Sequence, residues 1–437
     1  MTFEIYIVLL SLTSILLMAY LIRNSFEMLA IFSIAVFGVG LSLLKFLIGD
    51  SPTPTTNEAV LISYGGFTLF SLTLFILAIA NHERGLAGLA EIIHRLNPSK
   101  KETRLSLLFI FVLWGFRIFE ANVYGLGFEG TASADVIISL PYPVVVFSSI
   151  INLISGGAII ILTIAATQGG GRWLWLIIFV ELLMRFSSGG RRALVFYIFV
   201  VLWIALQARV IRLHALIFYV VVLSIILYII SPLFLEIREA NLYYLSRGFD
   251  TFSALSLSMF DAFQKCGIGI ECLGLASNNI IERPNVVEFF KSVVDSHLLG
   301  SPFIYGEGFV NAIKWAIPSI ILSKPEFQIE HLVQFSFGLK MLDDAISIPV
   351  IAYADGGLLG CMFAGICVVF FTKYFSMFAN SHNNDLLVLS MLLGLANNLW
   401  NVENDPLYYF VLVRDSLIIR FIIYDAINFI KFSYNLR

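Results

Sequence analysis

Residues 142–166, YPVVVFSSIINLISGGAIIILTIAA, contain no charged side chain. A helix needs about 20 apolar residues to cross the hydrocarbon core of a bilayer, and this run is long enough. In lipid the segment has to be helical, because an open strand edge finds no hydrogen-bond partner there. The stretch therefore predicts a transmembrane helix.

Similar apolar runs recur along the whole chain. Hydrophobic residues make up 59% of the sequence and charged residues 13%, against about 25% charged in soluble proteins. The sequence predicts an all-α polytopic membrane protein with about eleven transmembrane helices, within a range of roughly 10–14. The two runs 173–188 and 193–208 are short, so a tilted hairpin stays open for them. The remaining runs are 4–22, 28–49, 59–80, 105–124, 213–233, 349–371, 385–400 and 407–430.

The charges of the short loops predict the orientation. Loops 50–58, 125–135 and 401–406 contain no Lys or Arg. Loop 81–104 contains five basic residues, which are Arg84, Arg95, Lys100, Lys101 and Arg104. Cytoplasmic loops carry an excess of Lys and Arg, so loop 81–104 is predicted to be cytoplasmic. This order divides the chain into an N-terminal transmembrane bundle, a large external loop and C-terminal transmembrane helices, with the boundaries 1–233, 234–348 and 349–437.

The external loop is predicted to be a small helical cap on the membrane surface. It contains aromatic-rich helical stretches at 250–264, 286–294 and 309–322. Structureless loops of that length are uncommon in compact proteins. Cys266 and Cys272 lie in this loop, where an oxidising compartment would permit a disulfide. Spacing alone leaves that bond open.

Basic residues mark two candidate sites. Residues 187–194 read SSGGRRAL, which puts Arg191 and Arg192 at membrane depth on the external side, against the charge bias. Guanidinium groups suit a phosphate or diphosphate, although snorkelling arginines at lipid headgroups are an equal alternative. Arg238 and Arg247 follow the eighth run, where interfacial anchoring is the simpler interpretation.

Other titratable residues indicate little by themselves. Arg117 and Glu120 are three apart and could pair on one helix face. His297 and His331 are too scattered for a metal cluster. The net charge of -3 and the pI of about 6.1 favour no nucleic-acid partner. No phosphate loop or dinucleotide motif is present, so no cofactor and no metal are expected.

A third pattern consists of Tyr305-Gly306, Ile317-Pro318, Lys324-Pro325, Pro349, Tyr353, Gly357 and Gly360. This pattern resembles that of the bacterial oligosaccharide repeat-unit polymerases, the Wzy-type O-antigen polymerases. Its order is Tyr-Gly, a helix, Ile-Pro, Lys-Pro, Pro, then Tyr-x-x-x-Gly-x-x-Gly. Residues 189–194 are similar to the family's Gly-Ser-Arg-Gly-Ala-Leu motif, with Gly190 for Ser and Arg192 for Gly. The resemblance covers roughly residues 185–365.

The resemblance implies a GT-C-type glycosyltransferase of the bacterial inner membrane that acts at the periplasmic face. It would join undecaprenyl-diphosphate-linked oligosaccharides and work with a chain-length regulator protein. Its arginines would hold the diphosphates of donor and acceptor. These arginines are Arg191, Arg192 and Arg238, with Lys324 as a weaker candidate and Arg247 as a further substrate-binding residue.

The base and the sugar contacts stay open. His331, Glu307 and Asp344 are the candidates to take the acceptor proton. Tyr305 and Tyr353 would stack on sugars, or belong to the interfacial aromatic belt.

The alternative functions are an O-antigen ligase, a flippase or polysaccharide exporter, and a peptidoglycan polymerase. An O-antigen ligase shares the architecture but usually has a stronger external histidine motif than Glu330-His331. A flippase or polysaccharide exporter would have short loops, which the long external loop argues against. A peptidoglycan polymerase does not match the motifs.

Overall fold

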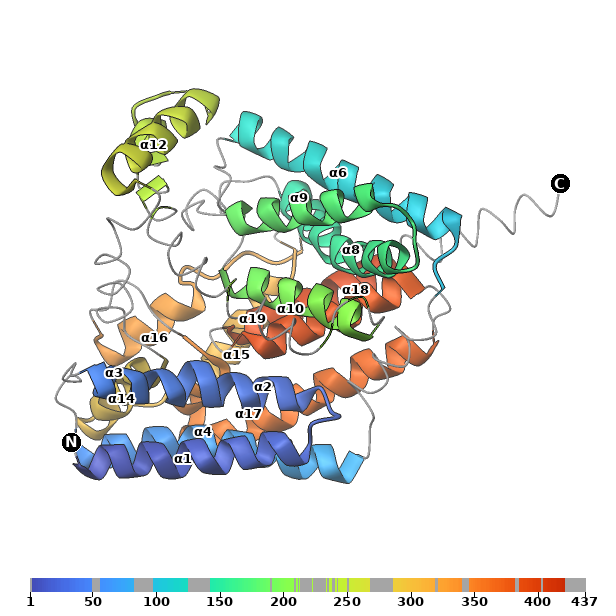
Figure 1. Ribbon diagram of the computed structural model, residues 1–437. Coiled ribbons are helices and arrows are strands. Elements are labelled where there is room, and N and C mark those ends of the chain that lie inside the picture. Colours follow the sequence, from blue (N-terminus) through green and yellow to red (C-terminus); the bar gives the residue numbers. More distant parts are fainter. Residues whose placement is uncertain are drawn as a thin grey trace. The chain divides into compact units, whose positions relative to one another are not determined.

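In the described residues of the computed structural model, helices are the regular secondary structure and no strand is present (Figure 1). The described residues are 2–48, 56–81, 97–124, 142–188, 191–207, 210, 212, 222, 233, 236–237, 240–241, 243–249, 251–267, 286–318, 321–339, 346–381, 385–401 and 404–420.

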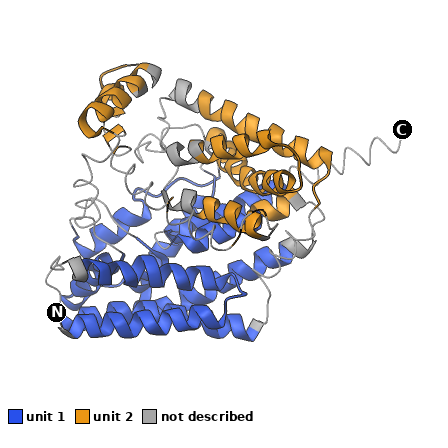
Figure 2. Ribbon diagram, in the orientation of Figure 1, with its two compact units in different colours: residues 1–90, 284–383, 391–437 blue, residues 91–283, 384–390 orange. Residues whose placement is uncertain are grey.

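The chain forms two compact units, each assembled from separate parts of the sequence (Figure 2). Unit 1 contains residues 1–90, 284–383 and 391–437, and unit 2 contains residues 91–283 and 384–390. The predicted division at 233 and 348 concerns membrane topology and stays a prediction.

Unit 1 is built around long helices that pack side by side. In this unit α17 packs on α4, α4 on α1, and α14 on α4 and α17. Its helices are α1 (Thr2–Leu21), α2 (Glu27–Ser33), the π-helical η1 (Ile34–Gly40), α3 (Leu41–Ile48), α4 (Asn57–Asn81), α14 (Val286–Leu298), α15 (Glu307–Ala316), α16 (Ile329–Phe337), α17 (Ile348–Ser381) and α19 (Pro406–Ile418). Helix α18 (Asp385–Trp400) begins in unit 2, and its residues from 391 belong to unit 1.

Unit 2 is centred on α8, which packs against α6, α9 and α10. Its described helices are α6 (Lys100–Tyr124), α8 (Tyr142–Thr167), α9 (Arg172–Ser188), α10 (Arg191–Gln207) and α12 (Thr251–Cys266).

Among the described residues, five helices are long and apolar enough to cross a membrane: Phe3–Leu21, Glu27–Lys45, Asn57–Ala80, Val146–Thr167 and Ile348–Phe378. Two shorter apolar helices are Phe196–Leu206 and Leu386–Trp400. The predicted helical fold class is therefore confirmed, and these apolar helices are compatible with the predicted membrane protein. The run 213–233 falls almost entirely outside the described residues, and the count of about eleven stays a prediction.

The helical stretches predicted in the external loop are present as α12, α14 and α15. Helix α15 stops at Ala316, earlier than predicted, and the backbone of Ile317 is extended (φ -68°, ψ 138°). Pro318 is the cause, because a proline disfavours the helical conformation of the residue before it.

Helix α14 is more deeply packed than a cap on the membrane surface would be. Its residues Val286 to Val294 are buried except for Ser292. This part of the predicted external loop thus belongs to the helical core of unit 1.

Candidate functional site

The predicted arginine pair begins a helix. Helix α9 ends at Ser188 and α10 starts with Arg191 and Arg192, so the two residues between them, 189–190, connect the helices. The side chains of both arginines lie outside the described part of the chain, as does the whole of Arg238. Arg247 is exposed, and its Cζ lies 4.6 Å from the centroid of the Tyr243 ring.

The third motif builds the start of α15. Tyr305 has a φ of 49° and Gly306 a φ of 89°, and Tyr305 is the one residue other than glycine with a positive φ in the described part. The carboxylate of Asp355, from α17, accepts hydrogen bonds from the backbone N–H of Gly308 (2.9 Å) and Phe309 (3.2 Å). Asp355 therefore satisfies donors that the first turn of a helix leaves without partners.

A kink in α17 brings the rest of the motif to the same place. The backbone leaves the helical conformation at Gly356 and Gly357. A Cβ on Gly360 would lie 1.9 Å from the carbonyl oxygen of Ala352, so the kinked backbone leaves no room for a side chain there. Packing thus explains Gly360, and a positive φ explains Gly306 and Gly357.

The two motif tyrosines have different surroundings. Tyr353 is 3% exposed, and its ring packs on Phe290, His297 and Phe303. Tyr305 is 82% exposed. Because a buried ring packs against protein, sugar stacking fits Tyr305 and does not fit Tyr353 in this conformation.

Lys324 lies at the other end of α15. Its Nζ donates to the carbonyl oxygens of Trp315 and Ile317, both at 2.5 Å, and lies 3.5 Å from that of Lys314. Arg414, from α19, donates to the carbonyl of Ala316 at 3.3 Å. Burial lowers the pKa of the Lys324 ammonium, and the charge of Arg414 lowers it further.

These contacts give Lys324 a structural role. Cations at the last carbonyls of a helix are stabilising, and an ammonium has three donors. A diphosphate at Lys324 would have to displace the carbonyls from it.

The three candidate bases differ in what the structure says of them. His331 is exposed on α16, and Glu307 is exposed at the first position of α15. Asp344 lies outside the described residues.

Among the described residues, no group of three His, Cys, Asp or Glu could hold a metal ion.

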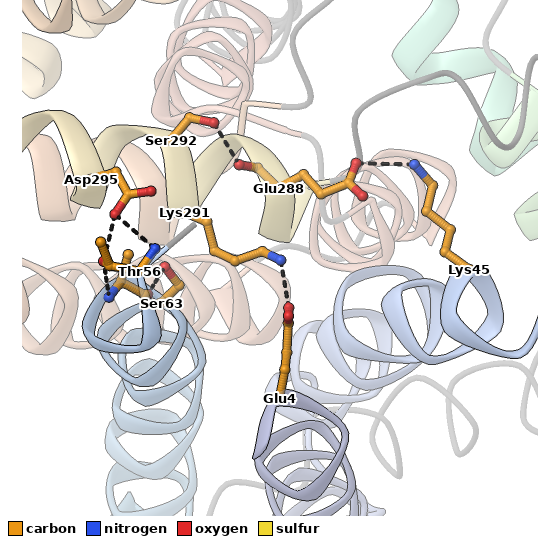
Figure 3. A network of polar contacts seen from close by, with 9 residues as sticks. Glu4, Lys45, Thr56, Ser63, Glu288, Lys291, Ser292 and Asp295 are labelled. Atoms are coloured by element: carbon orange, nitrogen blue, oxygen red, sulfur yellow. Dashed lines mark hydrogen bonds and ion pairs between the residues drawn. The ribbon is translucent and has the colours of Figure 1, made fainter. Parts of the chain in front are cut away.

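A charged network between α14 and the ends of three other helices was not predicted (Figure 3). Lys291 Nζ lies 2.6 Å from Glu4 Oε1, and Lys45 Nζ lies 3.0 Å from Glu288 Oε2. Asp295 accepts from the hydroxyl of Thr56 at 2.6 Å. The signal in the sequence is the spacing of Glu288, Lys291 and Asp295, which puts them on one helix face.

Arg117 pairs between helices. Its guanidinium lies 3.3 Å from Glu181 of α9 and donates to Asn152 of α8 at 3.2 Å. Trp114 Nε1 also donates to Glu181, at 2.7 Å. The sequence allowed a pair with Glu120 on the same helix face, and the side chain of Glu120 lies outside the described part. The interhelical bonds favour a structural role for Arg117 within unit 2.

Asp405 is a second residue that the sequence did not single out. It caps α19 by accepting a hydrogen bond from Leu407 N–H at 2.7 Å. Burial raises the pKa of its carboxyl to about 7; the bond from Leu407 opposes this shift, and the charge of Glu330 adds to it.

Cys266 is disulfide-bonded, whereas Cys361 and Cys367 are free. Cys272 lies outside the described residues.

A scan against protein-family models, a search of curated proteins and a search of solved structures each gave no match.

Proposed function

We propose that this chain is a bacterial inner-membrane polymerase that joins undecaprenyl-diphosphate-linked oligosaccharide repeat units into a surface polysaccharide. In this proposal it has about eleven spans in a GT-C-like arrangement, a periplasmic site, and a chain-length regulator as partner.

The observation that carries the proposal is the position of Arg191 and Arg192 at the start of α10. The N-terminal end of a helix already has a partial positive charge and N–H groups without partners. Two guanidinium groups there disfavour the helix by about 0.3–1 kcal/mol each, unless an anion offsets them. No acidic residue lies in the first turn of α10. A bound phosphate group would supply the missing negative charge.

This arrangement suits the chemistry of a lipid diphosphate. When the sugar is transferred, the bond between its anomeric carbon and the diphosphate breaks, and the diphosphate takes the electron pair. Fixed donors that meet this developing charge stabilise the transition state. Arg191 and Arg192 are the proposed donors, together with Arg238.

The disulfide at Cys266 supports a periplasmic long loop. Disulfides persist in oxidising compartments such as the bacterial periplasm. Cys266 follows the eighth apolar run in the segment that the positive-inside rule puts outside.

The test compares two arginines that begin neighbouring helices. Arg191→Ala, alone and with Arg192→Ala, should leave the amount of protein in the membrane unchanged and reduce the surface polysaccharide to a single repeat unit. Arg172→Ala at the start of α9, predicted to be cytoplasmic, should keep long chains. Long chains in the double variant would contradict the site.

Deletion of the gene separates the alternative functions. One repeat unit on the lipid core indicates a polymerase. A bare core with long lipid-linked chains would indicate a ligase, and a bare core with short trapped precursors would indicate a flippase.

The orientation has its own test. Cysteines placed in loop 125–135 should react with a membrane-impermeant thiol reagent added from outside, and those in loop 81–104 should not. The reverse pattern would invert the topology.

A further inference from the structure

His297, at the C-terminal end of α14, has an imidazole ring with a fixed proton position. Its Nδ1 lies 2.8 Å from the carbonyl oxygen of Ser301. A carbonyl only accepts, so Nδ1 carries the hydrogen. In the neutral ring the basic lone pair is then on Nε2, and no hydrogen bond to Nε2 is present among the described residues.

The ring is also held in its plane. Phe303 stacks on it, with ring centroids 3.9 Å apart and an interplanar angle of 27°. Tyr353 meets it edge-on at 6.2 Å. Phe303 and Tyr353 are the described rings in contact with it, and Tyr353 is the titratable one.

The carbonyl that orients His297 is itself fixed. The backbone N–H of Ser301 donates to the carbonyl of Ser296 at 3.1 Å, and the hydroxyls of the two serines are 2.8 Å apart. The Ser296 hydroxyl also donates to the carbonyl of Phe337 at 2.5 Å. A ring nitrogen held by such a partner leaves the other nitrogen in a defined direction, which is how proteins orient a histidine base.

His297 lies within the motif region. Phe303 packs against Gly357, and Ile304 N–H donates to the carbonyl of Ala354 at 2.9 Å. The exposed Tyr305 follows directly. His297 is half-buried and not fully enclosed. His331, the histidine suggested by the sequence, is exposed on α16 without a described partner that fixes its ring.

We propose that His297 is the general base of the glycosyl transfer. This proposal rests on the proposed function above. Nε2 takes the proton from the acceptor sugar hydroxyl while that oxygen bonds to the donor's anomeric carbon. The bond from this carbon to the lipid diphosphate breaks, and the diphosphate leaves with the electron pair. His297 then returns the proton to water.

A competing interpretation is that His297 only caps α14, because Ser301 lies just after the helix. His297→Asn separates the two roles. An asparagine amide can donate to the Ser301 carbonyl in place of Nδ1–H, but it offers no base. His297→Gln is the matched control for side-chain position. His331→Asn is the matched control for the loss of an exposed histidine.

The assay uses the full chain in lipid nanodiscs with an undecaprenyl-diphosphate-linked repeat unit, and it follows chain growth over pH. General bases contribute about 10²–10⁴-fold. His297→Asn and His297→Gln should therefore lower kcat by at least about 100-fold, with KM nearly unchanged and the acidic limb of the pH profile lost. His331→Asn should behave as the wild type. A His297→Asn enzyme with the wild-type rate and pH profile overturns the proposal.

A second measurement applies if the variants do not accumulate. Wild-type protein is treated with diethyl pyrocarbonate with and without the lipid-linked acceptor, and modification is read by mass spectrometry. The acceptor should protect His297 and leave His331 reactive. Equal modification of His297 in both samples overturns the inference. Wild-type protein that never lengthens chains overturns the proposed function instead.

Discussion

Removal of the Lys291 side chain tests the buried charge network of unit 1 most directly. Its Nζ lies 2.6 Å from Glu4, and the side chains are 2% and 11% exposed. Lys291→Ala leaves the Glu4 carboxylate in the same surroundings without its described partner. The second pair, Lys45 with Glu288, is not touched by the change.

The expected magnitude follows from burial. Breaking a buried pair by removing one partner costs about 3–5 kcal/mol, because a charge stays behind without compensation. Lys265 and Glu236 provide the matched control, because they are 2.7 Å apart but Lys265 is 61% exposed. An exposed pair is worth about 0–1 kcal/mol. The two ion pairs have almost equal N–O distances, but breaking them should lower the free energy of unfolding by very different amounts.

The free energy of unfolding would be measured by guanidinium titration of the purified protein in detergent. Lys291→Ala should lose about 3–5 kcal/mol, and Lys265→Ala should lose no more than about 1 kcal/mol. The double variant Glu4→Gln with Lys291→Met removes both charges and should regain most of the loss. Equal losses for the two lysines, or a double variant that is no better than Lys291→Ala, would refute the reasoning.

Two further predictions concern a glycine and a carboxyl group. Gly360→Ala should sharply reduce the amount of folded protein in the membrane, because a Cβ there lies 1.9 Å from the Ala352 carbonyl, whereas Gly65→Ala, with nothing within 4 Å, should be tolerated; equal abundance of the two variants would contradict the kink. The folded-state pKa of Asp405, about 7, lies above its ordinary value of about 4, so stability should fall as pH rises from about 4 to about 7 and then level off. Asp405→Asn keeps an acceptor for Leu407 N–H and should remove this part of the pH dependence of the thermal midpoint; an unchanged dependence would contradict it.

The helical fold class was predicted correctly from the sequence, because the hydropathy of each segment depends only on the residues of that segment. The five long apolar helices all overlap predicted runs, and the arginine pair falls at a helix start, where the predicted connection was. Pro318 shortened α15 through a local effect that the sequence shows, although the helix was predicted to run past it.

The partners of the charged side chains could not be predicted in the same way. Lys291 and Glu4 are 287 residues apart, and Lys45 and Glu288 are 243 apart. Arg117 binds Glu181 on another helix, at 3.3 Å, and no spacing within its own helix indicates that partner. Spacing shows which residues share a face of one helix, but only packing shows which helix lies opposite.

The contacts of α15 suggest a reason why motif residues and reacting groups differ in this chain. Asp355 satisfies the first N–H groups of α15, and Lys324 satisfies its last carbonyls together with Arg414. These charges are engaged in holding a helix of 10 residues, which is too short to be stable alone. Side chains engaged in this way are poor candidates to bind a diphosphate or to move a proton. Under the proposed function, the reacting groups are therefore side chains that the fold orients but leaves with a nitrogen or oxygen unused in its own hydrogen bonds. His297 Nε2 meets that condition among the described residues.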